Sequence, residues 1–185
     1  MHTAVVLNMF NNNRTKIFIF LLLILPCTNL NANQNASTHH IIPISFDAWT
    51  EHLSSYPPDI VVVDLWAMWC SSCLERFPEM VNLHNKYKDK GVSFISMNLD
   101  DRNDLESLQA AEQFVTSMNT QFEHFRMDEN LIIAFEKLNL ISIPAVFIYD
   151  QAGLEKYRLS GDNPNKQFTE HDIEEAIQSL IEIND

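Results

Sequence analysis

A short segment of this chain joins an apolar run to a closely spaced pair of cysteines. Residues 60–66 are almost entirely apolar, which is typical of a strand buried on both faces of a central sheet. The sequence Trp-Cys-Ser-Ser-Cys follows at residues 69–73. We expect a helix from Cys70 to about Lys90, with Gly91 as its stop signal. The segment therefore predicts a buried strand leading into a helix whose first turn carries two cysteines.

Two cysteines separated by two residues can close a small disulfide ring. At a helix N-terminus, Cys70 would face unpaired backbone N–H groups and the positive end of the helix dipole, which together stabilise a thiolate. We therefore expect Cys70 to be the attacking sulfur, and Cys73, one turn further along, to be shielded and to resolve the mixed disulfide. The alternative is that the two cysteines are two of the ligands of a zinc site. Zinc needs further ligands, and no second cysteine pair exists, so we expect neither a metal nor a cofactor.

Length and composition indicate one globular domain. The chain has 185 residues, of which 46% are hydrophobic and 20% are charged, values that are ordinary for a protein with a packed core. The formal net charge of −13 argues against a nucleic-acid partner, because no basic stripe is present to meet phosphates. We expect a polar tether at residues 33–39 and the folded domain at residues 40–185. A monomer is expected, since no dimerisation segment is apparent.

Residues 1–32 have the pattern of a secretory signal peptide. Arg14 and Lys16 form a basic region before the short apolar run of residues 17–25. That run is well below the roughly 20 residues that a membrane-spanning helix needs. Cleavage after Ala32 would remove two basic residues and no acidic one. The chain is therefore expected to be exported to the periplasm or another extracytoplasmic space.

Other readings of the N-terminus stay open. The segment could remain as an uncleaved membrane anchor, Cys27 could be lipidated, and Met9 could be the true start. Cleavage would leave Cys70 and Cys73 as the remaining cysteines. In an oxidising compartment such a pair either stays oxidised or is kept reduced by a dedicated donor.

The rest of the chain alternates between strand and helix patterns. Further strands are expected at residues 39–44, 92–97, 122–127, 145–149 and 154–159. Further helices are expected to begin at the capping residues Ser45, Asn103, Asp128 and Thr169. No internal repeat and no second domain is visible, so these elements are expected to form one α/β sheet domain.

The order of these elements resembles the thioredoxin fold over about residues 40–183. The specific motifs are residues 63–73, which contain both cysteines, and residues 141–145, which read Ile-Ser-Ile-Pro-Ala. The additional helix and short strand between residues 103 and 127, together with the export signal, resemble the TlpA/ResA-type branch of secreted thioredoxin-like proteins. The resemblance implies a central mixed β-sheet flanked by helices, with the inserted helix and strand placed before a cis-proline.

Asp64 interrupts the apolar strand, and burying a carboxylate without a partner is costly. The resemblance implies a buried acid beneath the disulfide. Desolvation raises the pKa of such an acid and lets it exchange a proton with Cys73. The alternative is a structural carboxylate that is satisfied by a neighbour or reaches solvent.

The resemblance also implies a substrate-binding surface made by Trp69, Ile143 and Pro144. A cis bond before Pro144 would turn the backbone of Ile143 outwards, where it could pair with an extended client strand. The alternative is an ordinary proline at the start of a strand. Trp69 would shield the disulfide and offer apolar surface to partners.

One position departs from the TlpA/ResA pattern. Proteins of this type usually carry an acidic residue three positions after the second cysteine, but this chain has Arg76 there and Glu75 one step earlier. One step turns a side chain by about 100° around a helix, so Glu75 need not replace the missing acid. This departure weakens any inference that apocytochrome c is the substrate.

Taken together, the motifs predict a thiol–disulfide oxidoreductase that reduces protein disulfides and receives electrons from a membrane donor. Its partners would be client proteins with disulfides or dithiols. One alternative is a dithiol oxidase that installs disulfides. The other is a non-catalytic module that binds clients and keeps a structural disulfide.

Overall fold

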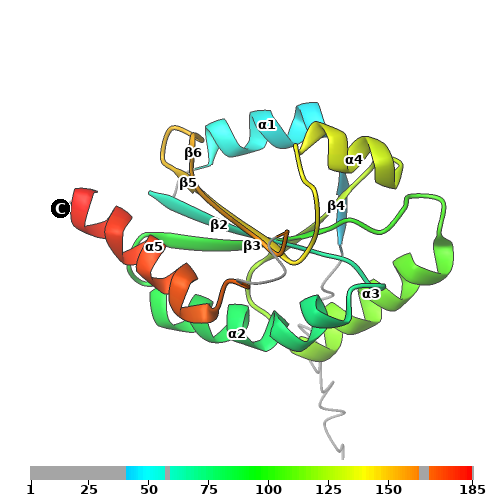
Figure 1. The fold of residues 1–185 in the computed structure, drawn as a ribbon, viewed down its shortest axis with the longest axis horizontal. Coiled ribbons are helices and arrows are strands. Elements are labelled where there is room, and N and C mark those ends of the chain that lie inside the picture. The colour runs from blue at the N-terminus through cyan, green and yellow to red at the C-terminus, as the bar shows by residue number, and fades with distance from the viewer. Residues whose placement is uncertain (1–40, 57–58, 163–166, 185) are drawn as a thin grey trace, which may run out of the picture. The chain divides into compact units, whose positions relative to one another are not determined.

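Six strands form a single mixed sheet in the computed structural model (Figure 1), which describes residues 41–56, 59–162 and 167–184. The order across the sheet is β1-β4-β3-β2-β5-β6. The strands are β1 (Ile42–Ile44), β2 (Ile60–Trp66), β3 (Val92–Asn98), β4 (Glu123–Met127), β5 (Ala145–Asp150) and β6 (Glu155–Ser160). Strands β1 to β4 are parallel where they pair, whereas β5 is antiparallel to both β2 and β6. The expected mixed sheet, with an inserted helix and strand before a cis-proline, is confirmed.

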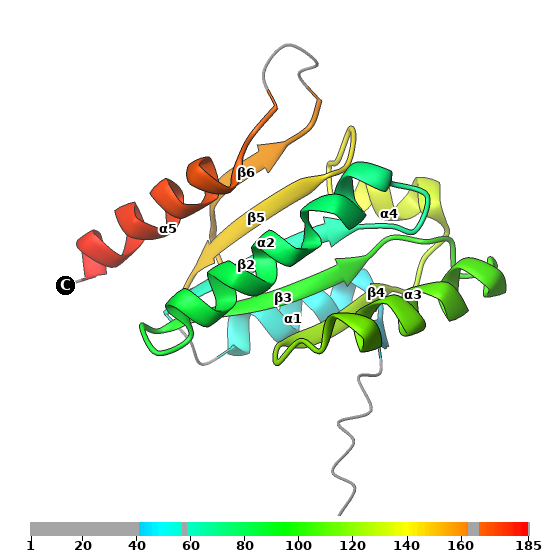
Figure 2. The same ribbon diagram turned by 90° about the horizontal axis from the view of Figure 1, so that it is seen from below.

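Helices cover both faces of this sheet (Figures 1 and 2). One face packs against α1 (Phe46–Ser55) and α4 (Leu131–Lys137). The opposite face packs against α2 (Ser71–Tyr87), α3 (Leu105–Met118) and α5 (Glu170–Asn184). Two apolar clusters, one on each face, therefore make up the core.

The central strand β2 contributes to both clusters because its side chains alternate between the two faces. Val61, Val63 and Leu65 face α1 and α4, whereas Val62 and Trp66 face the α2 side. All seven residues of β2 are buried, as the almost entirely apolar run predicts. The alternation places Asp64 on the α2 face, between Val62 and Trp66.

Two of the four predicted helix starts are confirmed. The Ser45 side chain accepts a hydrogen bond from the backbone N–H of Ala48 at the start of α1. At the start of α5, the Thr169 hydroxyl accepts from the Asp172 N–H, and the Asp172 carboxylate accepts from the Thr169 N–H. These reciprocal bonds satisfy backbone donors that a helix terminus leaves unpaired.

The other two predicted starts are wrong by one and two residues. The Asn103 N–H donates to the side chain of Asp101, which places Asn103 in the preceding turn and leaves Asp104 as the N-cap of α3. The N–H of Asp128 still donates to β1, so α4 starts later, with Asn130 as its N-cap. Both errors arise because several Asn and Asp residues near each helix start compete for the capping position.

The predicted signal peptide or anchor at residues 1–32 and the tether at residues 33–39 lie outside the described residues. In the part of the chain that the structure covers, every helix is too short or too polar to cross a membrane.

Candidate active site

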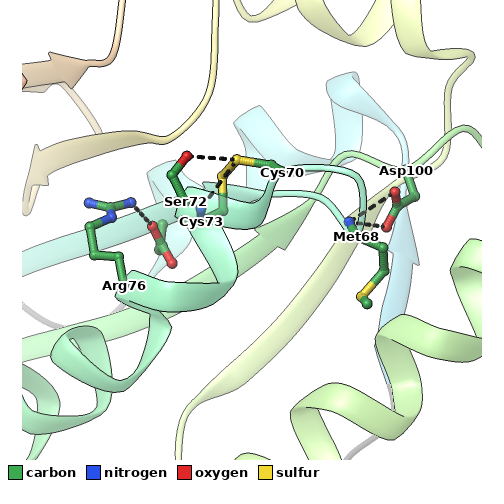
Figure 3. Close-up of a disulfide and its surroundings, with 7 residues drawn as sticks. Met68, Cys70, Ser72, Cys73, Arg76 and Asp100 are labelled. Atoms are coloured by element: carbon green, nitrogen blue, oxygen red, sulfur yellow. Dashed lines mark hydrogen bonds and ion pairs between the residues drawn. A yellow bond between two sulfur atoms is a disulfide. The ribbon is translucent and has the colours of Figure 1, made fainter.

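The two cysteines form a disulfide at the amino end of α2 (Figure 3). Cys70 is the N-cap residue, and its Sγ accepts a hydrogen bond of 3.3 Å from the backbone N–H of Cys73. The Ser72 hydroxyl lies 3.6 Å from the same sulfur. The sulfur of Cys70 therefore sits among the polar groups of a helix N-terminus, as predicted.

The disulfide is mostly covered, but its two halves differ in exposure. Cys70 keeps 6% of its surface accessible, whereas Cys73 keeps 1% and packs into the apolar cluster beneath α2. An incoming sulfur can therefore reach Cys70 more easily than Cys73. This order agrees with the roles predicted for the two cysteines.

The loop that precedes Cys70 is anchored to the end of β3. Both carboxylate oxygens of Asp100 accept from the backbone N–H of Met68, at 3.1 and 3.0 Å (Figure 3). The Asn98 side-chain amide donates to Asp100 at 2.7 Å, and the Asp100 N–H donates back to the Asn98 side chain. Burial raises the pKa of Asp100, and the bonds from Asn98 and Met68 oppose that rise. The buried pair thus holds the segment two residues before the disulfide.

The sequence analysis missed Asn98 and Asp100 as supports of the site. Both follow the apolar core of β3 directly, so polar residues at the carboxyl end of a buried parallel strand were the available signal. That signal identifies an edge of the sheet but does not identify the backbone group that the side chains bind.

Asp64 is buried, as predicted, and its partner is Arg76. One Nη atom of Arg76 donates to Asp64 Oδ1 at 2.6 Å, with both side chains almost completely covered (Figure 3). Burial raises the pKa of Asp64, and the positive charge of Arg76 acts in the opposite direction. The residue that departs from the TlpA/ResA pattern is therefore the counter-ion of the buried acid, a pairing that the sequence analysis did not predict.

Arg76 lies one turn after Cys73 on α2, and its guanidinium also covers an aromatic ring. The guanidinium carbon is 4.6 Å from the ring centroid of Phe168, in the segment before α5. Among the described residues, Arg76 Nε and Nη1 have no hydrogen-bond partner, and neither does Asp64 Oδ2. Glu75, one position earlier, is exposed, whereas Arg76 is buried.

The Ile143–Pro144 peptide bond is cis, as expected. Ala145 pairs with Leu65 on β2, so Pro144 lies at the sheet edge from which the cysteine-bearing loop leaves. The carbonyl of Pro144 accepts from the N–H of Gly161 at 3.0 Å, while the Ile143 side chain packs against both core clusters. The two motifs therefore meet at one edge of the sheet.

Trp69 is exposed over 55% of its surface, directly before Cys70. Its ring centroid is 6.4 Å from that of Phe135 on α4. Trp66, by contrast, is fully buried and packs against Phe77 and Phe114. Of these two tryptophans, Trp69 alone offers apolar surface beside the disulfide.

Similarity to known proteins agrees with this arrangement. The family model described as thioredoxin-like matches residues 58–154, which is more than half of the chain. The thiol-disulfide oxidoreductase ResA of Bacillus thuringiensis is 28% identical over 111 residues, covering 60% of each chain. ResA of Geobacillus kaustophilus is 28% identical over 131 residues, covering 70% of this chain and 68% of the relative. This chain thus spans about three fifths of the length of the first of these relatives.

Solved structures support the fold. A thioredoxin-like protein from Aeropyrum pernix superimposes with a TM-score of 0.52 at 21% identity, covering 69% of this chain and 81% of the other. The region that the family model matches, residues 58–154, contains the buried acid, the cysteine pair and the cis-proline in the order that the resemblance implies. The chain belongs to the thioredoxin-like family.

Proposed function

We propose that this protein is a thiol–disulfide oxidoreductase that exchanges electrons with protein disulfides through Cys70 and Cys73. The observation that carries the proposal is the disulfide at the amino end of α2, with Cys70 as the helix cap. The ResA relatives are named thiol-disulfide oxidoreductases, which supports the same activity.

In the reducing direction, the Cys70 thiolate attacks one sulfur of a client disulfide, and the other client sulfur leaves as a thiolate. The Cys73 thiolate then attacks Cys70 Sγ in the mixed disulfide. The Cys70–Cys73 bond forms, the second client sulfur leaves, and two electrons have passed to the client. The greater exposure of Cys70 supports its role as the attacking sulfur.

Resolution of the mixed disulfide requires that Cys73 lose its proton. Asp64 is the buried acid on the sheet face that α2 covers, and it pairs with Arg76 one turn after Cys73. We propose Asp64 as the group that accepts this proton. Its burial supports the role, because a desolvated carboxylate is a stronger base than an exposed one.

Clients would bind beside the disulfide on Trp69, Ile143 and Pro144. The half-exposed ring of Trp69 offers apolar contact, and the edge of the sheet at Pro144 suits an extended client segment. Such a surface would recognise unfolded or flexible segments rather than one particular folded partner.

We propose the reducing direction, with electrons supplied by a membrane donor. Ser71 and Ser72, between the cysteines, carry no charge and do not fix the direction. The thioredoxin-like buried Asp64 is the feature that favours the reducing direction. A redox titration against glutathione tests this direction. A potential near that of strong oxidants would instead identify a dithiol oxidase.

Export is part of the proposal. Residues 1–32 would act as a signal peptide or anchor, residues 33–39 as a tether, and residues 40–185 as the active domain outside the cytoplasm. An oxidising compartment suits a chain that retains a cysteine pair for exchange.

Reduction of insulin disulfides tests the activity itself. We expect the protein with dithiothreitol to precipitate insulin faster than dithiothreitol alone, and the Cys70→Ser variant to lose this acceleration. A Cys70→Ser variant as active as wild type would contradict the proposal. Absence of acceleration by wild type would favour a client-binding module with a structural disulfide.

A further inference from the structure

The ion pair beneath the active-site helix has a consequence for the proton that Cys73 must lose. Cys73 and Arg76 are three residues apart on α2, and both are buried toward the sheet. Figure 3 shows Arg76 and Cys73 on the same helix, and a dashed line marks the ion pair of Arg76 with Asp64. The cation is therefore built into the same helix as the two sulfurs.

Burial dictates the charge state of this pair. A guanidinium stays protonated at any pH that a folded protein meets, so Arg76 brings a permanent positive charge into the interior. A neutral Asp64 would leave that charge unbalanced at a contact of 2.6 Å, which is strongly unfavourable. The carboxylate form of Asp64 is therefore the stable form while the disulfide is closed.

One other charged group acts on the pKa of Asp64. Glu79, also on α2, acts in the opposite sense to Arg76 and more weakly. On the adjacent strands, the residues beside Asp64 are Ser96 and Val146, which are uncharged. Ser96 is hydrogen-bonded at 2.6 Å to Nδ1 of His124 on β4, which is the nearest titratable group on that strand. Helices α3 and α5 pack on this face through apolar side chains. Among the described residues, Arg76 is thus the main counter-ion.

We propose that Arg76 is a positioning residue that holds Asp64 as a carboxylate on the sheet face under α2, so that Asp64 can accept the Cys73 proton when a mixed disulfide is resolved. This inference rests on the proposed function, because it describes a step of that reaction. It assigns a role to the one residue of the helix that departs from the TlpA/ResA pattern.

The step balances in protons and charge. The Cys73 thiol gives its proton to the Asp64 carboxylate, and the sulfur becomes a thiolate. The positive charge of Arg76, which had balanced the carboxylate, then balances the new thiolate, so the net charge of the site does not change. The thiolate attacks Cys70 Sγ, and the client sulfur leaves and takes up a proton. Asp64 returns its own proton to solvent and pairs again with Arg76.

Titration of the Asp64 carboxyl carbon by ¹³C NMR tests the first half of the proposal in the oxidised protein, where neither Cys70 nor Cys73 has a thiol that titrates. The signal is identified by its absence from the Asp64→Asn/Arg76→Met double variant. We expect Arg76→Met to raise the Asp64 titration midpoint by about one pH unit or more, and Arg76→Lys to restore part of the wild-type value. Glu79→Gln is the matched control on the same helix, with a small shift in the opposite direction. An unchanged midpoint in Arg76→Met would overturn the proposal.

Stopped-flow reaction of the reduced protein with 5,5′-dithiobis(2-nitrobenzoate) tests the second half. The second release of nitrothiobenzoate reports attack by Cys73 on the mixed disulfide. We expect the limb of its pH profile that Asp64 causes to shift in Arg76→Met by the same number of pH units as the NMR midpoint. In the double variant that limb should be absent, so that the rate follows only the ionisation of the Cys73 thiol. A limb that stays at its wild-type pH in the double variant would contradict a proton-accepting role for Asp64. Failure of wild-type protein to accelerate insulin reduction would count against the proposed function, and the NMR titration would still decide what Arg76 does.

Discussion

A buried charge is stable only beside an opposite charge, and Asp64 and Arg76 meet this condition in the interior of the molecule. The two partners are not equivalent when one is removed. Asp64 without Arg76 can take up a proton and become neutral, because burial raises its pKa. Arg76 without Asp64 cannot become neutral in this way, since guanidinium does not lose its proton.

This asymmetry predicts that Asp64→Asn destabilises the protein more than Arg76→Met does. We expect Asp64→Asn to lower the free energy of unfolding by about 3–5 kcal/mol at pH 7, the usual cost of leaving a buried charge unpaired. The double variant should recover part of that loss. Urea denaturation of the oxidised proteins measures these differences. Equal losses in the two single variants would contradict the asymmetry.

Trp69 supports a second prediction at the residue scale. We expect Trp69→Ala to slow the reduction of a protein disulfide by about tenfold, the effect of losing about 1.4 kcal/mol of apolar contact, because the half-exposed ring meets the client. Reduction of a small disulfide such as hydroxyethyl disulfide should change little. Leu154→Ala, which removes an exposed apolar side chain at the far end of β5, is the control. An equal decrease in the reduction rates of both substrates would contradict a role for Trp69 in binding the client protein.

Individual residues were predictable where a local pattern marks them. The cysteine spacing identified the disulfide, and the lone acid in an apolar strand identified Asp64. The pairing of Asp64 with Arg76 was not predictable, because it joins β2 to a helix position whose side-chain direction depends on the fold. The same holds for the Asp100–Met68 contact, which joins residues 32 positions apart.

At the level of elements, the loop before the disulfide depends on β3. We expect Asp100→Ala to lower the free energy of unfolding by about 1–3 kcal/mol, because the partly buried N–H of Met68 would lose its acceptor. The same change should alter the rate at which reduced Cys70 reacts with iodoacetamide. Urea denaturation and alkylation kinetics measure the two effects. Glu106→Ala, at an exposed position on α3, is the control. If Asp100→Ala matched Glu106→Ala in both measurements, the anchoring role of Asp100 would be refuted.

Helix α2 also carries a buried histidine whose protonation is expected to make the stability of the protein depend on pH. His84 is buried against the rings of Phe94 and Phe122, and burial lowers its pKa below the ordinary 6.5. The unfolded chain therefore binds this proton at higher pH than the folded chain does. The contribution of neutral His84 to stability is complete above about pH 6.5 and is lost as the pH falls from there toward its lowered pKa.

We therefore expect His84→Phe to lose less stability than wild type between pH 7 and pH 5. Chemical denaturation at each pH measures the slope. His171→Gln, which changes an exposed histidine on α5, should keep the wild-type slope. Parallel slopes for wild type and His84→Phe would show that another group causes the acid sensitivity.

For the whole molecule, the order of strands and helices was predictable because hydrophobic periodicity changes clearly between them. The mixed sheet could be predicted from the resemblance. The register between paired strands could not be predicted, since it is set by contacts between residues distant in sequence. Helix starts were predicted within two residues at Asn103 and Asp128, where neighbouring side chains competed for the cap. The organisation of the site thus follows from the sheet, which brings the ends of β2, β3 and β5 to one edge.

The most direct test of the central claim is to trap the mixed disulfide. Reduced Cys73→Ser and Cys70→Ser proteins are each incubated with oxidised insulin, and covalent adducts are detected by non-reducing electrophoresis and mass spectrometry. The account predicts an adduct through Cys70 in the Cys73→Ser protein and little or none in the Cys70→Ser protein. Equal adducts in both variants, or an adduct only through Cys73, would contradict it.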